Sequence, residues 1–125
     1  MIILDASALL AFLFNESGRE RVAEHVESSC LSAVNLTEVI GKFVQHGHSA
    51  DLVLGKIMAS TIEVVPFSPP DAALAASLLP RTKPFGLSLA DRACLALAIT
   101  RGVPVLTADR AWAGLDIGVA VYVIR

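Results

Sequence analysis

Hydrophobic and polar residues form alternating blocks along the chain, and these blocks predict strands and helices in turn. The first four residues are all apolar and end at Asp5, which is typical of a strand buried on both faces of a parallel sheet. Residues 6–14 remain apolar, but their alanine and leucine content favours a helix. Residues 19–27 are charged on one side and carry valines on the other, which predicts an amphipathic helix.

The rest of the chain continues this alternation. Strands are predicted at 30–32, 61–66, 104–106 and 119–124, helices at 35–45, 50–59, 69–79 and 88–100, a loop at 80–86 and a short turn or helix at 109–114. Strands that alternate with helices from end to end predict an α/β sandwich with a mainly parallel sheet. The length of 125 residues suits a single domain over 1–125.

Composition adds three expectations. Hydrophobic residues make up 54% of the chain and charged residues 18%, so it can fill a core and has apolar surface left for a partner. No apolar run is long enough to span a membrane and no basic segment of a signal peptide precedes Asp5, so we expect a cytoplasmic protein. Cys30 and Cys94 are expected to be buried free thiols, as in a reducing compartment.

Four acidic residues are expected to meet at one edge of the sheet. Asp5 directly follows the first predicted strand, and Asp109 lies just beyond the strand at 104–106. Glu38 and Asp91 each lie about one turn into a predicted helix. In open α/β sheets, ligands bind outside the carboxyl ends of the strands, where the following helices begin.

Each acid also has a simpler interpretation, because acids near helix starts cap free backbone N–H groups. The capping candidates are Asp5 with Ser7, Asn35-x-x-Glu38, Ser88-x-x-Asp91 and Asp109. The apolar surroundings of Asp5 and Asp91 favour convergence, because a buried charge needs a partner or a cation. Crowded carboxylates suit a hard divalent ion, Mg²⁺ or Mn²⁺, and such ions serve phosphodiester hydrolysis.

Four sequence blocks carry a family resemblance that covers nearly the whole chain. The blocks are IILDASALLAFLFNE, NLTEV, GLSLADRACLALA and VLTADRAWAGL, followed by the closing VAVYVIR. In this order and spacing they resemble the PIN-domain nucleases, and specifically the VapC toxins of bacterial VapBC toxin–antitoxin pairs. The resemblance implies a Rossmann-like three-layer α/β/α sandwich with about five strands.

The resemblance also implies an activity and roles for individual residues. It implies a metal-dependent endoribonuclease (a hydrolase) that acts on structured RNA such as tRNA or rRNA, forms a homodimer and is inhibited by a cognate VapB-type antitoxin. Mg²⁺ or Mn²⁺ would be the cofactor. The catalytic metal ligands, directly or through water, would be Asp5, Glu38, Asp91 and Asp109. Ser7 and Thr107 would support them by hydrogen bonds.

Binding of RNA requires local cations, because the formal net charge of −2 gives no general attraction to a polyanion. Arg92 and Arg110 are candidates because each adjoins a predicted site acid, and Arg81 and Lys83 lie in the predicted loop that flanks the same edge. The alternative is that all four are solvated surface charges.

The segment at 8–14 is too apolar all round for a helix with one wet face. One hypothesis is that it forms a groove for an antitoxin helix, together with Val39, Phe43 and Val44. The alternative is that these residues are simply core.

Other functional classes fit less well. A haloacid-dehalogenase-type phosphatase needs a second aspartate where Ser7 stands, and a receiver domain needs an acceptor aspartate after the strand that ends at Pro66. No GxGxxG for a nicotinamide cofactor follows the first strand. The remaining alternative is a non-catalytic RNA- or protein-binding module.

Overall fold

The computed structural model describes all residues from 1 to 125 and contains one parallel sheet of five strands, in the order β3-β2-β1-β4-β5. The strands are β1 (Ile2–Leu4), β2 (Ser29–Ser32), β3 (Glu63–Val65), β4 (Val105–Thr107) and β5 (Val121–Val123). Every pair of neighbouring strands is parallel, which confirms the predicted sheet.

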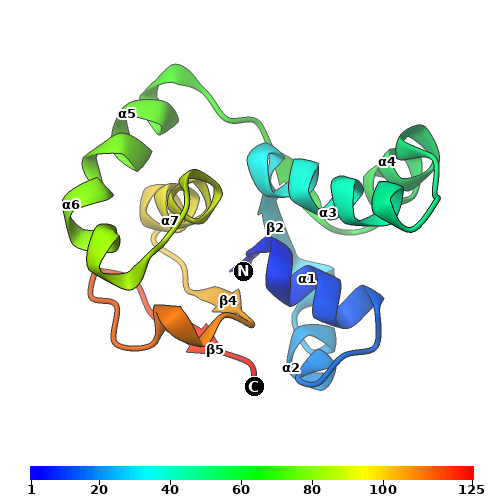
Figure 1. Cartoon of the computed structure of the whole chain (residues 1–125), viewed down its shortest axis with the longest axis horizontal. Coiled ribbons are helices and arrows are strands. Elements are labelled where there is room, and N and C mark those ends of the chain that lie inside the picture. The colour runs from blue at the N-terminus through cyan, green and yellow to red at the C-terminus, as the bar shows by residue number, and fades with distance from the viewer.

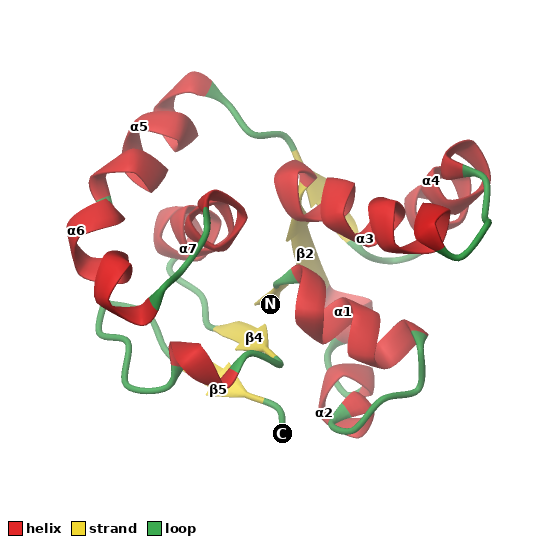
Figure 2. Ribbon diagram, viewed as in Figure 1, coloured by secondary structure: helices red, strands yellow, loops and turns green.

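Helices connect successive strands and cover both faces of the sheet (Figures 1 and 2). The α-helices are α1 (Ala6–Leu13), α2 (Arg19–Ala23), α3 (Ala33–Gln45), α4 (Ala50–Met58), α5 (Pro69–Ser77), α6 (Leu79–Thr82) and α7 (Leu89–Arg101). Short 3₁₀ helices are η1 (Val26–Ser28), η2 (Lys83–Phe85) and η3 (Arg110–Trp112). The predicted three-layer α/β/α architecture is therefore confirmed.

Two hydrophobic cores lie on the two faces of the sheet. Residues of β1 alternate between them, since Ile2 and Leu4 belong to the core under α1–α4, whereas Ile3 belongs to the core under α5–α7. This alternation follows from the two-residue side-chain period of a strand. Because β1 is buried on both faces, its sequence is apolar without interruption.

The strand order places a topological switch between β1 and β4. From β1 the chain builds outward through β2 and β3 on one side, and then returns to add β4 and β5 on the other. Ile3 and Leu4 of β1 are in register with Val105 and Leu106 of β4, so the two strands end side by side. Ligands bind at such a switch point in open α/β sheets.

Two sequence predictions of secondary structure were wrong. The helix predicted over 19–27 ends at Ala23, and a turn with η1 replaces its second half because β2 already begins at Ser29. The predicted loop over 80–86 is helical in α6 and η2, since proline is tolerated in the first turn of a helix, where it stands in both elements.

The structure also bears on the thiols and on membrane insertion. Cys30 and Cys94 are both buried and free, as predicted. None of the helices combines the length and the apolar character that crossing a lipid bilayer would require.

Candidate active site

The carboxylate of Asp5 lies buried at the carboxyl end of β1, at the switch point. It caps α1, because the backbone N–H of Ala8 donates to Oδ1 at 2.8 Å. The hydroxyl of Thr107, at the end of β4, donates to Oδ2 at 2.6 Å. The hydroxyl of Ser7 lies 2.8 and 2.9 Å from the two carboxylate oxygens.

Ser7 and Thr107 also connect the start of α1 with the segment that follows β4. The backbone N–H of Ala108 donates to Ser7 Oγ at 2.9 Å, and that of Asp109 donates to Thr107 Oγ1 at 3.0 Å. The two hydroxyl oxygens lie 3.3 Å apart. The predicted hydrogen-bonded neighbours of Asp5 are therefore in place.

Burial raises the pKa of Asp5 from 3.8 to about 6, although the hydrogen bonds from Thr107, Ala8 and Ser7 oppose that rise. The charge of Asp91 raises the pKa further. No arginine, lysine or histidine offsets these effects, since none of the ion pairs of the chain includes Asp5. Asp5 is thus a buried acid that its own chain supplies with hydrogen bonds but with no cation.

Asp91 stands in the first turn of α7 and forms a capping box with Ser88, as the sequence allowed. The backbone N–H of Ser88 donates to Asp91 Oδ2 at 2.8 Å, and the backbone N–H of Asp91 donates to Ser88 Oγ at 3.2 Å. The second carboxylate oxygen of Asp91 accepts no hydrogen bond from the chain. The cap therefore occupies only half of this carboxylate.

Glu38 is not part of a capping box, so that alternative is wrong at this position. Helix α3 begins at Ala33 and is capped by Ser32, because β2 ends there and Ser32 Oγ accepts from the N–H of Val34. Asn35 is instead inside the helix, and its side-chain amide donates to Glu38 Oε1 at 3.1 Å. The carboxylate of Glu38 lies at the exposed surface of α3.

Three of the acids lie near the buried thiol of Cys94. It is fully buried in α7, and burial is the main reason why its pKa is raised well above 9.0. The charges of Asp5, Asp91 and Glu38 raise this pKa further. Asp5 after β1, Asp91 in α7 and Glu38 in α3 therefore all lie close enough to influence one buried thiol.

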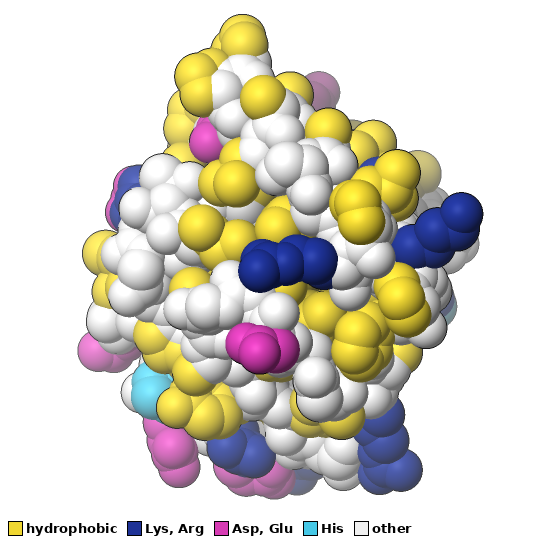
Figure 3. Space-filling view, turned by 90° about the vertical axis from the view of Figure 1, so that its left-hand side faces the viewer, with side chains coloured by type: hydrophobic (Ala, Val, Ile, Leu, Met, Phe, Trp, Pro, Cys, Tyr) yellow, Lys and Arg dark blue, Asp and Glu magenta, His cyan; other side chains and the backbone are white.

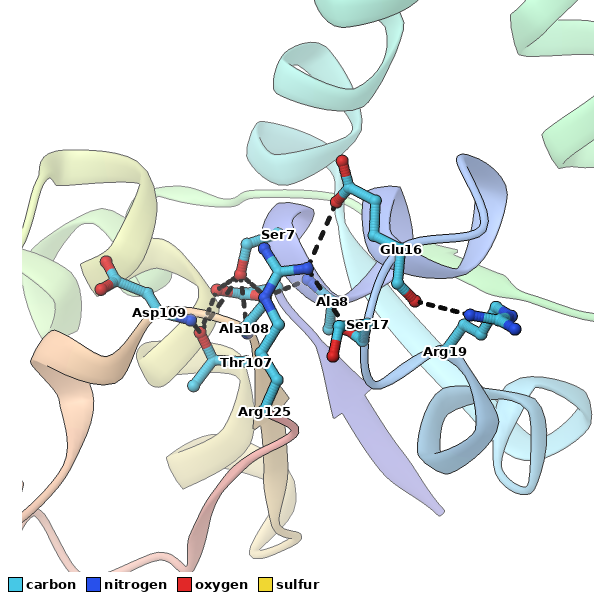
Figure 4. Close-up of polar contacts among 10 residues, drawn as sticks. Ser7, Ala8, Glu16, Ser17, Arg19, Thr107, Ala108, Asp109 and Arg125 are labelled. Carbon is cyan, nitrogen blue, oxygen red and sulfur yellow. Dashed lines mark hydrogen bonds and ion pairs between the residues drawn. The ribbon is translucent and has the colours of Figure 1, made fainter.

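Asp109 lies at the periphery of this group. Its Oδ1 accepts from the N–H of Ala111 at 2.9 Å and caps η3. Its backbone contacts Thr107, but its carboxylate is exposed and is turned away from Ser7 and Thr107 (Figure 4). Asp109 therefore lies at the predicted edge of the sheet. Its charge is not among those that raise the pKa of Asp5.

The acids do not form a ready-made cage for a dehydrated ion. Nowhere in the chain are three histidine, cysteine, aspartate or glutamate side chains close enough together to hold one metal directly. Glu38, Asp91 and Asp109 each leave one carboxylate oxygen free of hydrogen bonds within the chain. Such an all-oxygen set fits a hydrated Mg²⁺ or Mn²⁺, which keeps several waters and uses few carboxylates.

The four basic candidates differ in their freedom to contact a ligand. Arg81 and Lys83 are exposed on α6 and η2. The face of the molecule over α5 and α6 carries separate basic side chains among apolar ones (Figure 3). Arg110 is exposed, and its Nε donates to the backbone oxygen of Arg125 at 2.9 Å. Arg92 is half-buried, and its Nη1 lies 3.4 Å from the carbonyl oxygen of Leu87.

An apolar groove of about 210 Å³ lies between the end of α1, α3 and α4. Leu13 and Phe43 contribute to it, and α4 provides most of the rest. The ring of Phe43 stacks on that of Phe14 with centroids 4.8 Å apart. Val39 was predicted to line this groove, but it is fully buried in the core beneath α3 and does not reach it.

Asn35 is the residue at this site that sequence reasoning missed. It was interpreted only as a possible cap, although its three-residue spacing from Glu38 places both side chains on one face of a helix. Its amide also donates to the backbone carbonyl of Ala90 in α7. This contact depends on tertiary packing and has no signal in the sequence.

Comparison with known proteins places the chain in a family. Its fold matches a sarcin-ricin loop cleaving toxin, VapC20 of Mycobacterium tuberculosis, with a TM-score of 0.76 at 19% identity over 96% of this chain and 99% of that one. It also matches DNA-bound VapBC of Salmonella typhimurium, with a TM-score of 0.70 at 19% identity over 99% of this chain and 98% of that one. FitAcB of Neisseria gonorrhoeae matches with a TM-score of 0.70 at 23% identity over 98% of this chain and 96% of that one. No curated protein matches the sequence. The family model for the PIN domain, however, matches residues 2–117, and the chain therefore belongs to the PIN-domain family.

Proposed function

We propose that this protein is a Mg²⁺- or Mn²⁺-dependent endoribonuclease and the toxin of a type II toxin–antitoxin pair. PIN domains are generally nucleases and typically use divalent metals, which supports the activity. The observation that carries the proposal is the buried carboxylate of Asp5, which lies at the switch point with Asp91 and Glu38 nearby and without a cation from its own chain. A divalent ion bound there would supply the missing positive charge.

Asp5 and Asp91 would hold the metal, in part through water, and Glu38 and Asp109 would orient water molecules around it. When bound, a divalent ion lowers the pKa of water and stabilises negative charge on the leaving oxygen of a phosphodiester. Ser7 and Thr107 keep the Asp5 carboxylate in one orientation, because both hydroxyls contact its oxygens.

The proposed reaction is hydrolysis with in-line attack of water on the phosphorus. The water oxygen bonds to phosphorus and gives up a proton, the bond from phosphorus to the 3′ oxygen breaks, and that oxygen takes up a proton. The products are a 5′-phosphate and a 3′-hydroxyl. Arg81, Lys83 and Arg110 are exposed and can contact flanking phosphates. Arg92 is less accessible and contributes less.

Structured RNA is the proposed substrate class, since the similar VapC20 is described as a toxin that cleaves the sarcin-ricin loop. The proposed partner is a VapB-type antitoxin, because several solved structures with this fold are complexes of toxin with antitoxin. We place an apolar antitoxin helix in the groove between α1, α3 and α4, where Leu52 of α4 is 68% exposed. A homodimer would cover further apolar surface.

Cleavage of a mixture of tRNA and rRNA by the purified protein tests the activity. We expect cleavage with Mg²⁺ or Mn²⁺ and none with EDTA or in the Asp5→Asn variant. Cleavage that survives both the chelator and the substitution would refute the mechanism. Binding of RNA without cleavage by the wild type would favour a non-catalytic module.

The ends of the products test the chemistry separately. We expect 5′-phosphates, which a phosphate-dependent exonuclease recognises, whereas 2′,3′-cyclic phosphates would show attack by the ribose hydroxyl. Growth arrest upon expression, absent in the Asp91→Ala variant, tests the role as a toxin.

A further inference from the structure

Asn35 is a buried polar residue that connects two of the helices carrying the site acids. Its side chain is only 1% exposed. Its amide nitrogen donates to Glu38 Oε1 and to the backbone carbonyl of Ala90, both at 3.1 Å. Ala90 immediately precedes Asp91 in the first turn of α7. One amide group thus joins the carboxylate of Glu38 in α3 to the backbone beside Asp91.

The orientation of this amide is determined by its neighbours. A carboxylate and a carbonyl both accept hydrogen bonds, so only the nitrogen of Asn35 can face them. The oxygen of the amide, Asn35 Oδ1, is then buried and meets no donor in the chain. A buried polar atom without a partner costs free energy, so an apolar side chain of similar shape would serve packing alone at least as well.

The contact with Ala90 is not needed to complete α7. The carbonyl of a residue in the first turn of an α-helix accepts the N–H four residues further on, which here belongs to Cys94. The bond from Asn35 is therefore an additional one. The bond to Ala90 fixes the Asn35 amide relative to α7. The bond from the same amide to Glu38 Oε1 can then restrain the Glu38 side chain.

Glu38 needs such a restraint because its side chain is exposed and can rotate about three bonds. No arginine, lysine or histidine pairs with it. The only hydrogen bond to its carboxylate within the chain comes from Asn35, and it occupies Oε1 and leaves Oε2 free.

From this geometry we infer that Asn35 is a positioning residue, which ties the Glu38 carboxylate to the backbone beside Asp91 and so sets the spacing of these two acids. The inference rests on the proposed function, because it takes Glu38 to be an acid of the metal site. It assigns to Asn35 no contact with substrate.

A double-mutant cycle with two readouts tests this inference in the full chain. Asn35→Leu keeps the branching and the number of heavy atoms of the side chain, with somewhat bulkier methyl groups, and removes the donor. Glu38→Ala removes its acceptor. RNA cleavage and the Kd of Mn²⁺, measured by electron paramagnetic resonance of the free ion, are determined for the wild type, both single variants and the double variant. Thr37→Ala serves as control, because the exposed Thr37 hydroxyl contacts only its own helix.

We expect Asn35→Leu to slow cleavage and to weaken Mn²⁺ binding by about tenfold, the usual effect of losing a group that orients a ligand. In the Glu38→Ala background the same substitution should have no further effect, because the group it acts through is gone. The thermal midpoint of the Asn35→Leu single variant should equal or exceed that of the wild type. If Asn35 served only to stabilise the fold, its loss would lower this midpoint. Thr37→Ala should match the wild type throughout.

Three results would overturn the inference. Unchanged cleavage and Mn²⁺ affinity in Asn35→Leu would show that Glu38 needs no restraint, and an equal loss in both backgrounds would show that Asn35 acts elsewhere. A loss of cleavage that only follows a lower thermal midpoint would make Asn35 a packing residue. The proposed function fails separately, if the wild type itself neither cleaves RNA nor binds Mn²⁺.

Discussion

Two carboxylates at opposite edges of the same sheet have opposite electrostatic environments. At the amino edge, Glu63 of β3 forms two hydrogen bonds of 2.8 and 2.9 Å with the guanidinium of Arg101 at the end of α7. This arginine lowers the pKa of Glu63. At the carboxyl edge, Asp5 of the β1–α1 junction has only uncharged donors, and burial raises its pKa to about 6.

Of these two acids, only the exposed Glu63 is paired with a cation from its own chain. Glu63 is exposed and would tolerate solvent, yet it has a bidentate arginine partner. Asp5 is buried and needs a cation more, but its neighbours include Asp91, a further acid. A buried charge without a partner costs stability, and a fold retains such a cost at functional sites. The carboxyl edge is therefore the one prepared for a cation from solution.

The largest difference between the two edges should appear in catalysis. Asp5→Asn keeps the shape of the side chain and removes its charge, and we expect RNA cleavage to fall by about a hundredfold or more. Glu63→Gln, the matched change at the other edge, should leave cleavage within a factor of about two. Initial rates under identical Mg²⁺ conditions measure both. Equal losses in the two variants would remove the distinction between the edges.

The second difference concerns stability without metal. Because the pKa of Asp5 rises from 3.8 to about 6 on folding, the folded state holds this proton more tightly than the unfolded state. The resulting stabilisation is complete below pH 3.8 and is lost as the pH rises through about 6. A shift of this size corresponds to a loss of at most about 3 kcal/mol in the free energy of unfolding.

Asp5→Asn should remove this pH dependence. In EDTA, the free energy of unfolding of the variant should therefore rise relative to that of the wild type between pH 4 and pH 7.5. Urea unfolding at several pH values measures the change, with Asp116→Asn as control, since Asp116 is exposed in a loop. If the wild type and Asp5→Asn lose stability with pH in parallel, Asp5 is not the buried acid described above.

Thr107→Val should have the third largest effect. The substitution removes the hydroxyl that donates to Asp5 Oδ2 and accepts from the N–H of Asp109, while it keeps the β-branched shape. We expect cleavage to fall by about tenfold, because the ligand loses its orientation. Thr37→Val, at an exposed position of α3, should leave the rate unchanged. A Thr107→Val enzyme with full activity would make this hydroxyl a structural group only.

The smallest effect is expected for the ion pair at the amino edge. Glu63→Gln leaves Arg101 without its carboxylate, but both side chains reach solvent, so the thermal midpoint should drop only slightly. The decrease should shrink further at high salt, which screens exposed charges. A large decrease that does not depend on salt would mean that this pair stabilises the fold much as a buried pair does.

Most of the fold was predictable because local signals agree with it. The uninterrupted apolar run of β1 and the alternation of strand with helix both indicated the observed elements. The failures were segments where tertiary context decides the outcome. The length of α2 depends on where β2 must begin, and Pro80 is compatible with both a loop and a helix start.

The site was predictable in its position more than in its contacts. The strand ends indicated where Asp5 and Asp109 lie, and the predicted hydrogen bonds from Ser7 and Thr107 are present. Capping does not exclude a second role, since the cap of Asp91 uses one carboxylate oxygen and leaves the other free. The sequence could not reveal that Asp109 turns outward or that Asn35 contacts α7, because both depend on how separate segments pack.

The metal site can be located directly by soaking crystals of the wild-type protein in Mn²⁺ and measuring anomalous scattering. The account predicts a strong peak at the carboxyl edge beside Asp5, bound to Asp91 directly or through water, and no such peak in Asp5→Asn crystals. Ordered Mn²⁺ only at surface acids such as Glu63, with none beside Asp5, would contradict it.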